Sequence, residues 1–220
     1  MKNGLTGLKD WEFDSNVASG FVEHARRHIP NYEQVIDKCA RYCALNLEKD
    51  SVIIDVGCAT GHTLTKLHDL GFTDLHGVDN SKHMVDLAPK DIATYVVQDT
   101  FPTGRYDMIL CNWTLHFIRN KLDYLHRMRD GLNEGGSLII SEKISKDPAL
   151  IKMYHDHKTR LGVSKEVIEQ KQKQLENVMF IESMDWYQRT LQDMGFGVSI
   201  IDADWCFATF LCRKKNRAGA

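Results

Sequence analysis

The segment from Ser51 to Thr63 places Asp55, Gly57 and Gly61 directly after a short apolar run. A glycine turn after a buried strand lets the backbone come close to a ligand, because a β-carbon would block that approach. A dinucleotide site would carry the pattern G-x-G-x-x-G, whereas here the spacing is D-x-G-x-x-x-G. An aspartate before the loop would repel a pyrophosphate and could orient a cationic group. We therefore predict a ligand with a positively charged end.

Three further apolar runs also end in polar residues. Asp79 ends the second run. A carboxylate accepts hydrogen bonds from two vicinal hydroxyls, so we predict that Asp79 binds the ribose of the ligand. Asp99 ends the third run, where it could accept from an adenine amino group, and Asn112 ends the fourth. Open α/β sheets bind ligands at the carboxyl ends of their strands. The four positions together indicate S-adenosylmethionine, which carries an ammonium and a sulfonium group.

Strand and helix patterns alternate along the chain and would position these residues. Residues 1–28 are polar and only weakly periodic, and helical spacing then runs over 30–47. From 51 to 143, apolar runs alternate with helical periodicity, which predicts a mostly parallel sheet covered by helices. The last two strands, 197–203 and 204–214, are almost continuous, so they must pair antiparallel. We predict a Rossmann-like α/β fold with a seven-stranded sheet and an antiparallel terminal strand.

The alternation is interrupted after Lys143 by a long polar stretch with helical character. Residues 147–180 show no strand signal, so they are predicted to form a helical insert. The chain has 220 residues and 43% apolar content, which is enough to bury a full core. We therefore predict a single domain over residues 1–220 that contains this insert.

Composition limits the partners and the compartment. The net charge of -2 provides no basic field for nucleic acid, and no apolar run reaches the roughly 20 residues that span a bilayer. The first sixteen residues lack the apolar core of a signal peptide, and the six cysteines lack CxxC spacing. We predict a cytoplasmic protein with a small-molecule substrate, no direct nucleic-acid partner and no membrane contact. A homodimer is left open, and no metal site is predicted, because His155 and His157 are two apart and diverge on a helix.

The motifs "DVGCATG", "VDNS", "QDT" and "NWTLHF" together resemble those of class I S-adenosylmethionine-dependent methyltransferases. The motifs "SEKIS", "YHDHKTRLGVSKEVIEQK" and "LENVM" are similar to those of one member family, the carboxy-S-adenosylmethionine synthases. That family uses prephenate to convert S-adenosylmethionine into its carboxy derivative for tRNA wobble-uridine modification. The resemblance covers about residues 29–212. It implies the class I methyltransferase fold, with S-adenosylmethionine or its carboxy derivative as cofactor.

The resemblance also implies a set of cofactor contacts in this chain. These fall on Tyr32, Gly57, Cys58, Ala59, Asp79, Asn80, Asp99, Thr100 and Asn112. An arginine of the family's insert helix grips the new carboxylate, and the matching position here is Gln172. A neutral amide lacks the charge-assisted bidentate contact of a guanidinium. Lys171 and Lys173 flank it, each about 100 degrees round the helix, so we expect both to point elsewhere.

Four residues are candidates for the substrate side: His116, Glu142, Gln172 and Tyr187. His116 lies just beyond a strand end and is either a base or substrate contact or a structural residue. Glu142 either faces substrate or pairs with the neighbouring Lys143. Tyr187 fits the core face of a helix, although the family places that helix near the pocket. Methyl transfer mainly requires in-line positioning in a dry pocket, so no catalytic residue is assigned.

Three functions follow from these observations. The first is a methyltransferase that acts on a small-molecule acceptor, and it is favoured because Gln172 replaces the family's arginine. The second is a carboxy-S-adenosylmethionine synthase. The third is a noncatalytic S-adenosylmethionine-binding module, which would keep the glycine loop but close the substrate side.

Overall fold

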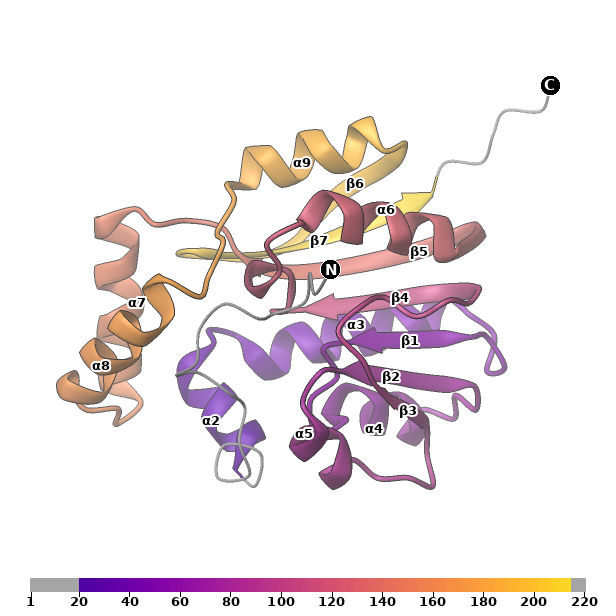
Figure 1. Ribbon diagram of the computed structural model, residues 1–220, viewed down its shortest axis with the longest axis horizontal. Helices are drawn as coiled ribbons and strands as arrows, with labels where there is room; N and C mark the ends of the chain where they lie inside the picture. The colour runs from indigo at the N-terminus through magenta and orange to yellow at the C-terminus, as the bar shows by residue number, and fades with distance from the viewer. Residues whose placement is uncertain (1–19, 215–220) are drawn as a thin grey trace.

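A seven-stranded sheet runs through the middle of the molecule (Figure 1). The computed structural model describes residues 20–214, so the N-terminal segment considered above as a signal peptide lies outside the described residues. The strands are β1 (Ile53–Val56), β2 (Leu75–Asp79), β3 (Thr94–Val97), β4 (Tyr106–Asn112), β5 (Leu132–Lys143), β6 (Phe196–Asp204) and β7 (Phe207–Lys214).

The strand order is β3-β2-β1-β4-β5-β7-β6. Strands β1 to β5 pair in parallel, and β7 is antiparallel to both of its neighbours. The predicted Rossmann-like sheet with an antiparallel terminal strand is therefore confirmed. The order in which the chain adds strands to the sheet reverses between β1 and β4, and such a switch point is where open α/β sheets bind ligands.

Helices cover both faces of this sheet (Figure 1). They are α2 (Phe21–His28), α3 (Tyr32–Asn46), α4 (His62–Asp69), α5 (Lys82–Leu87), α6 (Lys121–Gly131), α7 (Pro148–Arg160), α8 (Lys165–Glu176) and α9 (Met184–Asp193), with a 3-10 helix, η1 (Leu115–Phe117). Among the described residues, no helix has the length and apolar character needed to cross a membrane.

Strand β4 is apolar at successive positions because both of its faces are covered by helices. Met108 and Leu110 pack into the core cluster that contains residues of α3 and α4. Ile109 and Cys111 pack into the other cluster, with residues of α6 and α9. Successive side chains of a strand point to opposite faces, so a strand covered on both sides must be apolar at every position. All four side chains are fully buried.

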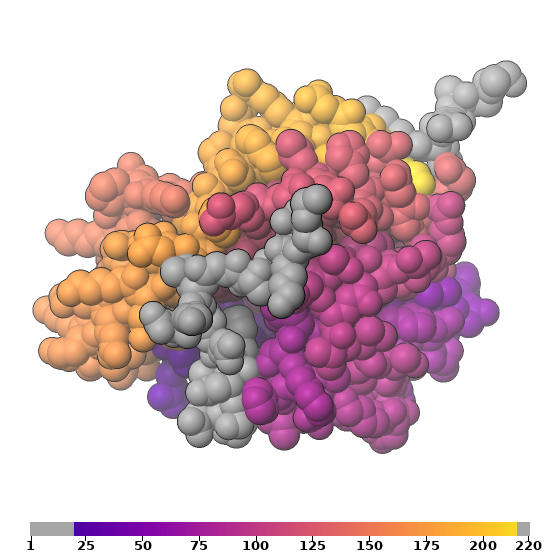
Figure 2. Space-filling view, viewed as in Figure 1, coloured from indigo at the N-terminus to yellow at the C-terminus, as the bar shows by residue number. Residues whose placement is uncertain are grey.

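The predicted helical insert is formed by α7 and α8, which stand beside α2 off the carboxyl end of the sheet (Figure 1). Asp147 caps α7 by accepting from the backbone N–H groups of Ala149 (2.8 Å) and Leu150 (3.1 Å), and Pro148 occupies the first turn. Ser164 caps α8 in the same way. The space-filling view shows the insert as a lobe beside the sheet domain (Figure 2).

Two local features differ from the sequence analysis. Helix α2 lies within residues 1–28, for which no helix is predicted, yet Phe21, His24 and His28 are half-buried on the same helix face as the buried Ala25. Helix α3 begins at Tyr32 rather than at Pro30, since Asn31 adopts a left-handed conformation with φ of 54°. Asparagine tolerates this conformation better than most residues.

Candidate cofactor and substrate site

A cavity of about 1000 Å³ lies at the carboxyl edge of the sheet. Residues at the ends of β1, β2 and β4 form one wall, and residues of α2, α7 and α8 form the opposite wall. The topological switch point between β1 and β4 opens into this cavity. Sequence positions far apart in the chain therefore face each other across a single space.

Strand β1 and the loop after it contribute four predicted residues to the wall: Asp55 from the strand, and Gly57, Cys58 and Ala59 from the loop. Gly57 has a φ of 71°, and a β-carbon at this position would collide with the hydroxyl of Thr114. That hydroxyl is held within hydrogen-bond distance of the carbonyls of Val56 (3.1 Å) and Asn112 (3.0 Å), and its single hydrogen can be donated to either one. The structure thus gives a further reason for glycine here besides approach of a ligand: the loop after β4 packs against it.

Gly61 is not in the wall of the cavity. It adopts a φ of 78° at the start of α4, where a β-carbon would lie 2.5 Å from the hydroxyl of Tyr95. The glycine therefore serves the turn and its packing. Ala59 also has a left-handed φ, 47°, which costs a non-glycine residue about 1–2 kcal/mol.

Asp79 is held at the wall by two backbone donors. Its carboxylate accepts from the N–H of Ala59 at 2.9 Å and from the N–H of Ser81 at 2.8 Å. Burial raises the pKa of Asp79, and these backbone hydrogen bonds act in the opposite direction. Each carboxylate oxygen keeps a lone pair that can accept from a ligand hydroxyl. The geometry suits the predicted ribose contact.

Asp55 is a buried carboxyl group in the cavity wall, with only 3% of its surface exposed. Its pKa is raised to about 8, mainly by desolvation and also by the negative charge of Asp79, while a hydrogen bond from Thr63 acts in the opposite direction. No described cation forms an ion pair with it. A carboxyl group in such a place is suited to a cationic ligand.

An aromatic pair closes the cavity between α3 and β4. Tyr32 and Trp113 stack with their ring centroids 5.0 Å apart and both line the cavity. Trp113 adopts a φ of 54°, which directs the chain away from β4. Beside it, Asn112 accepts a hydrogen bond from the Ser141 hydroxyl at 2.6 Å and also lines the cavity.

The remaining predicted cofactor residues divide into two groups. Asn80, which follows β2, and Asp99, which follows β3, line the cavity. Thr100 does not, and its carbonyl instead accepts from the Gln98 side chain at 2.6 Å. All of the predicted cofactor-binding residues except Gly61 and Thr100 therefore line the cavity.

His116 and Glu142 form a buried pair below the cavity. His116 lines the cavity, and its Nδ1 lies 2.7 Å from Glu142. Glu142 is fully buried and also accepts from the backbone N–H groups of Thr114 (3.1 Å), Leu115 (2.7 Å) and His116 (2.8 Å). The carboxylate thus holds the first turn of η1 and orients the imidazole. It does not form an ion pair with Lys143.

Two predicted substrate-facing residues lie outside the cavity wall. Glu142 is occupied by the donors of η1, and Tyr187 is fully buried in the core, with its ring 5.5 Å from that of Phe210. Glu142 therefore orients a cavity residue without facing the cavity itself. Tyr187 lies on the core face of α9, as one of the two sequence-based alternatives expected.

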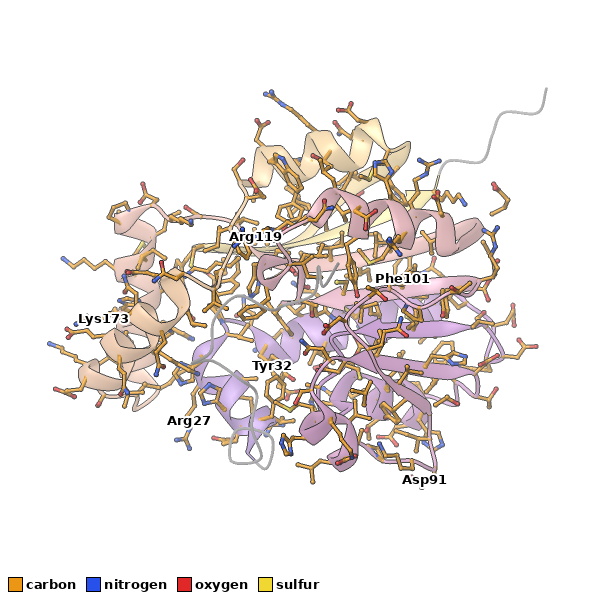
Figure 3. The ribbon with its side chains drawn as sticks, viewed as in Figure 1. Arg27, Tyr32, Asp91, Phe101, Arg119 and Lys173 are labelled. Atoms are coloured by element: carbon orange, nitrogen blue, oxygen red, sulfur yellow. The ribbon has the colours of Figure 1, made fainter. Side chains whose placement is uncertain are left out.

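The insert wall carries lysines from three elements: Lys143 at the end of β5, Lys158 on α7 and Lys171 on α8. Gln172 also lines the cavity. The expectation that Lys171 points elsewhere is wrong, because α8 turns this residue toward α2, where it contacts His24. Lys173 does point away, and it lies on the outer side of the insert, far from Tyr32 (Figure 3).

Several wall residues were not identified from the sequence. His24 and His28 come from α2, and their spacing with Phe21 and Ala25, at positions i, i+3, i+4 and i+7, is the helical signal that could have identified them. Trp113 follows Asn112 directly, so the same strand-end argument could have included it. Lys158 has no local signal, since its place in the wall depends on how α7 packs. Among the described residues, no group of three metal-ligating side chains is found.

The acceptor groups present fit S-adenosylmethionine. Asp55 offers a buried carboxyl group without a cationic partner among the described residues, and Asp79 offers two anchored acceptors. Asp99 stands at the end of the neighbouring strand, as an adenine contact requires. A ligand with a cationic end, a ribose and an adenine matches this series of acceptors.

Comparison with known proteins places this site in a family. The methyltransferase domain family matches residues 23–192, which is most of the chain. The chain belongs to the S-adenosylmethionine-dependent methyltransferases. A carboxy-S-adenosyl-L-methionine synthase of Sodalis glossinidius is 31% identical to it, over 88% of this chain and 86% of that protein. One from Campylobacter hominis is 31% identical over 94% and 95%, respectively.

Solved structures show the same fold. The magnesium protoporphyrin IX methyltransferase of Synechocystis PCC 6803 with bound S-adenosylhomocysteine matches with a TM-score of 0.64, at 16% identity, over 90% of this chain and 94% of that one. The plantazolicin methyltransferase BpumL, also with S-adenosylhomocysteine, matches with a TM-score of 0.69 at 14% identity, over 91% and 90%. This methyltransferase-fold protein is thus an S-adenosylmethionine-dependent transferase.

Proposed function

We propose that this methyltransferase transfers the methyl group of S-adenosylmethionine to a small molecule bound in the same cavity. The observation that carries the proposal is the extent of the cavity, which continues from the strand ends to the insert wall. Ligand pockets range from about 300 to 1,000 Å³, so this cavity has room for a second molecule beside the cofactor. A noncatalytic binding module would instead close the substrate side.

The cofactor would be held by the acceptors of the strand ends. Asp79 would bind the ribose hydroxyls, Asp99 the adenine amino group, and Asp55 with Asn112 the methionine end. The bound cofactor supplies an activated methyl group. The chain's own contribution is to orient the acceptor, exclude water and receive a proton where the acceptor must lose one.

His116 is our candidate for that proton acceptor. Its Nδ1 is engaged by Glu142 at 2.7 Å, which fixes the ring and leaves Nε2 as the nitrogen available to the cavity. A carboxylate behind an imidazole stabilises the imidazolium that forms when Nε2 takes a proton. Acceptors that react as free amines or thiolates would not need this step.

Turnover with labelled cofactor tests the methyltransferase function. The protein would be incubated with methyl-labelled S-adenosylmethionine and a small-molecule metabolite extract, and labelled products would be identified by mass spectrometry. We expect one labelled product together with S-adenosylhomocysteine. Tight binding of S-adenosylmethionine with no labelled product from any extract would instead support a binding module.

Carboxy-S-adenosylmethionine synthesis is the second candidate. Two observations favour it: the 31% identical relatives bear that name, and Lys171 lines the cavity next to Gln172. A lysine beside the missing arginine offers another cation for a carboxylate, although without bidentate geometry. The product formed from S-adenosylmethionine and prephenate, measured by mass, separates the two candidates.

Gln172→Arg sharpens this distinction. If the wild type is a methyltransferase, it should bind S-adenosylmethionine at least as well as the carboxy derivative. The arginine should then favour the carboxy derivative by about 1.5–3 kcal/mol through a charge-assisted pair. Competitive calorimetry of both cofactors on wild type and variant measures this. A wild type that already prefers the carboxy form and makes it from prephenate would overturn the methyltransferase proposal.

A further inference from the structure

The insert wall contains one buried lysine, Lys158, and one half-buried lysine, Lys143, whose charges are not balanced by the described residues. Lys158 is only 6% exposed, and neither it nor Lys143 forms an ion pair with any described carboxylate. Burying a charged group is costly unless a partner of opposite charge compensates it. Lysines are seldom fully buried without such a partner. Two on one cavity wall therefore call for a ligand.

Both ammonium groups gather around one aromatic ring. The Nζ of Lys158 lies 3.8 Å from the ring centroid of Tyr154, and the Nζ of Lys143 lies 5.3 Å from it. Tyr154 is itself fixed, because its hydroxyl donates to the His28 carbonyl at 2.6 Å. A cation–π contact stabilises each ammonium only partly. The ring holds the two groups on the same side of the cavity.

A third cation, Lys171, completes the wall from α8, where it contacts His24. Burial and the neighbouring lysines lower the pKa of Lys158 to about 7, and burial lowers that of Lys171 to about 8. Glu176 also lines the cavity, but it is exposed and accepts from Gln172 at 3.4 Å. The local field at this end of the cavity is therefore positive.

We propose that Lys143, Lys158 and Lys171 form a subsite for a carboxylate or phosphate group of the substrate. The substrate is then an anionic small molecule, with its charged end on the insert and its reacting end toward the strand ends. Anion binding by these lysines is independent of the proposed function. The identification of the anion as part of the substrate rests on that function.

Probe binding tests the subsite without a known substrate. Inorganic phosphate and succinate would be titrated into the full chain at pH 6.5 and constant ionic strength, with binding followed by calorimetry and amide NMR shifts. This pH is below the pKa of Lys158 and of Lys171, so the protonated form of each predominates. We expect saturable binding of at least one probe, and a preference between phosphate and succinate would identify the chemical class of the charged group.

Substitutions on one helix provide the matched control. Lys171→Met should weaken probe binding at least tenfold, whereas Lys173→Met, two residues along α8 on the outer side, should leave it unchanged (Figure 3). Lys158→Met should weaken binding equally and Lys158→Arg should retain most of it. Equal binding by wild type, Lys158→Met and Lys171→Met, or no binding of either probe to the wild type, would overturn the proposal.

Thermal stability separates a binding role from a structural one. Removing an unbalanced buried charge should raise the melting temperature of Lys158→Met at pH 6.5 without a probe, because the folded state no longer desolvates an ammonium. A lower melting temperature together with unchanged probe binding would assign Lys158 to the fold instead. Turnover of methyl-labelled S-adenosylmethionine by the wild type, measured in parallel, tests the proposed function separately: saturable anion binding without a methylated product would overturn that function and leave the subsite.

Discussion

The two walls of the cavity carry opposite charge and are built in different ways. The strand-end wall presents carboxyl groups of Asp55, Asp79 and Asp99, and backbone N–H groups hold the second of these in place. The insert wall presents the ammonium groups of Lys143 and Lys158 around one tyrosine ring. The first wall comes from neighbouring strands, whereas the second brings together the end of β5 and a helix of the insert.

This contrast indicates how one cavity could hold two different molecules, each at its own end. A ligand with a cationic end is favoured at the strand ends and disfavoured at the insert, and the reverse holds for an anion. The acidic wall is built on and directly after the neighbouring strands β1, β2 and β3. The basic wall depends on the insert, which is where a family of common fold can differ in substrate.

Asp79→Ala should produce the largest loss on the acidic wall. The variant removes an acceptor that is anchored at 2.9 Å and 2.8 Å by backbone donors and cannot be replaced by water without disturbing the loop. We expect S-adenosylmethionine affinity to fall by about 1.5–3 kcal/mol, the range for hydrogen bonds to charged groups. Titration calorimetry measures it.

Asp91→Ala is the control, because Asp91 is exposed and lies away from the cavity wall. Its affinity for the cofactor should equal that of the wild type. Unchanged affinity in a folded Asp79→Ala variant would remove Asp79 as the ribose ligand.

The pH dependence of cofactor binding should be the next largest effect. Burial raises the pKa of Asp55 to about 8, so below that pH the group is neutral and cannot attract a cation. S-adenosylmethionine affinity should therefore rise with pH between 6 and 8, by at most roughly tenfold per unit, and level off above 8. Binding of the permanently charged sulfonium favours the ionised carboxyl group and should release a proton.

The free energy of unfolding of the ligand-free protein should fall over the pH range in which cofactor affinity rises. A carboxyl group whose pKa is higher in the folded state than in the unfolded state destabilises the ligand-free protein as pH rises from about 4 to 8. Asp55→Asn should show weak cofactor binding that is independent of pH. Persistence of the wild-type pH profile in this variant would assign the titration to another group.

The acidic wall could be predicted because its residues are encoded locally. Each of Asp55, Asp79 and Asn112 ends a continuous apolar run, and parallel strands bring their carboxyl ends to one edge. Gly57 was found for the same reason, although its packing against Thr114 is a contact between loops 57 residues apart that no local pattern encodes.

The basic wall could be predicted only in part. The insert was recognised as helical from its polar periodicity, and its caps at Asp147 and Ser164 are local signals. Which face of α8 meets the cavity depends on its packing, and this is why Lys171 was placed wrongly. Helix α2 carries a local signal, since Phe21, His24, Ala25 and His28 recur at helical spacing, but only its packing shows that this face meets the cavity.

Thr63→Val should give the smallest effect and the most specific one. Thr63 is buried in the cavity wall, and its hydrogen bond to Asp55 lowers the pKa of that carboxyl group. Valine keeps the shape but removes the donor, so the pKa of Asp55 should rise by roughly half a unit to one unit. The midpoint of the cofactor-binding pH profile should move upward equally, and carbon NMR of the Asp55 carboxyl group reports the shift directly. Thr65→Val on the same helix removes only a hydroxyl that donates to the Gly61 carbonyl at 3.0 Å, and it should leave the midpoint unchanged. A midpoint that stays fixed in Thr63→Val would show that the titrating group of the acidic wall is not Asp55.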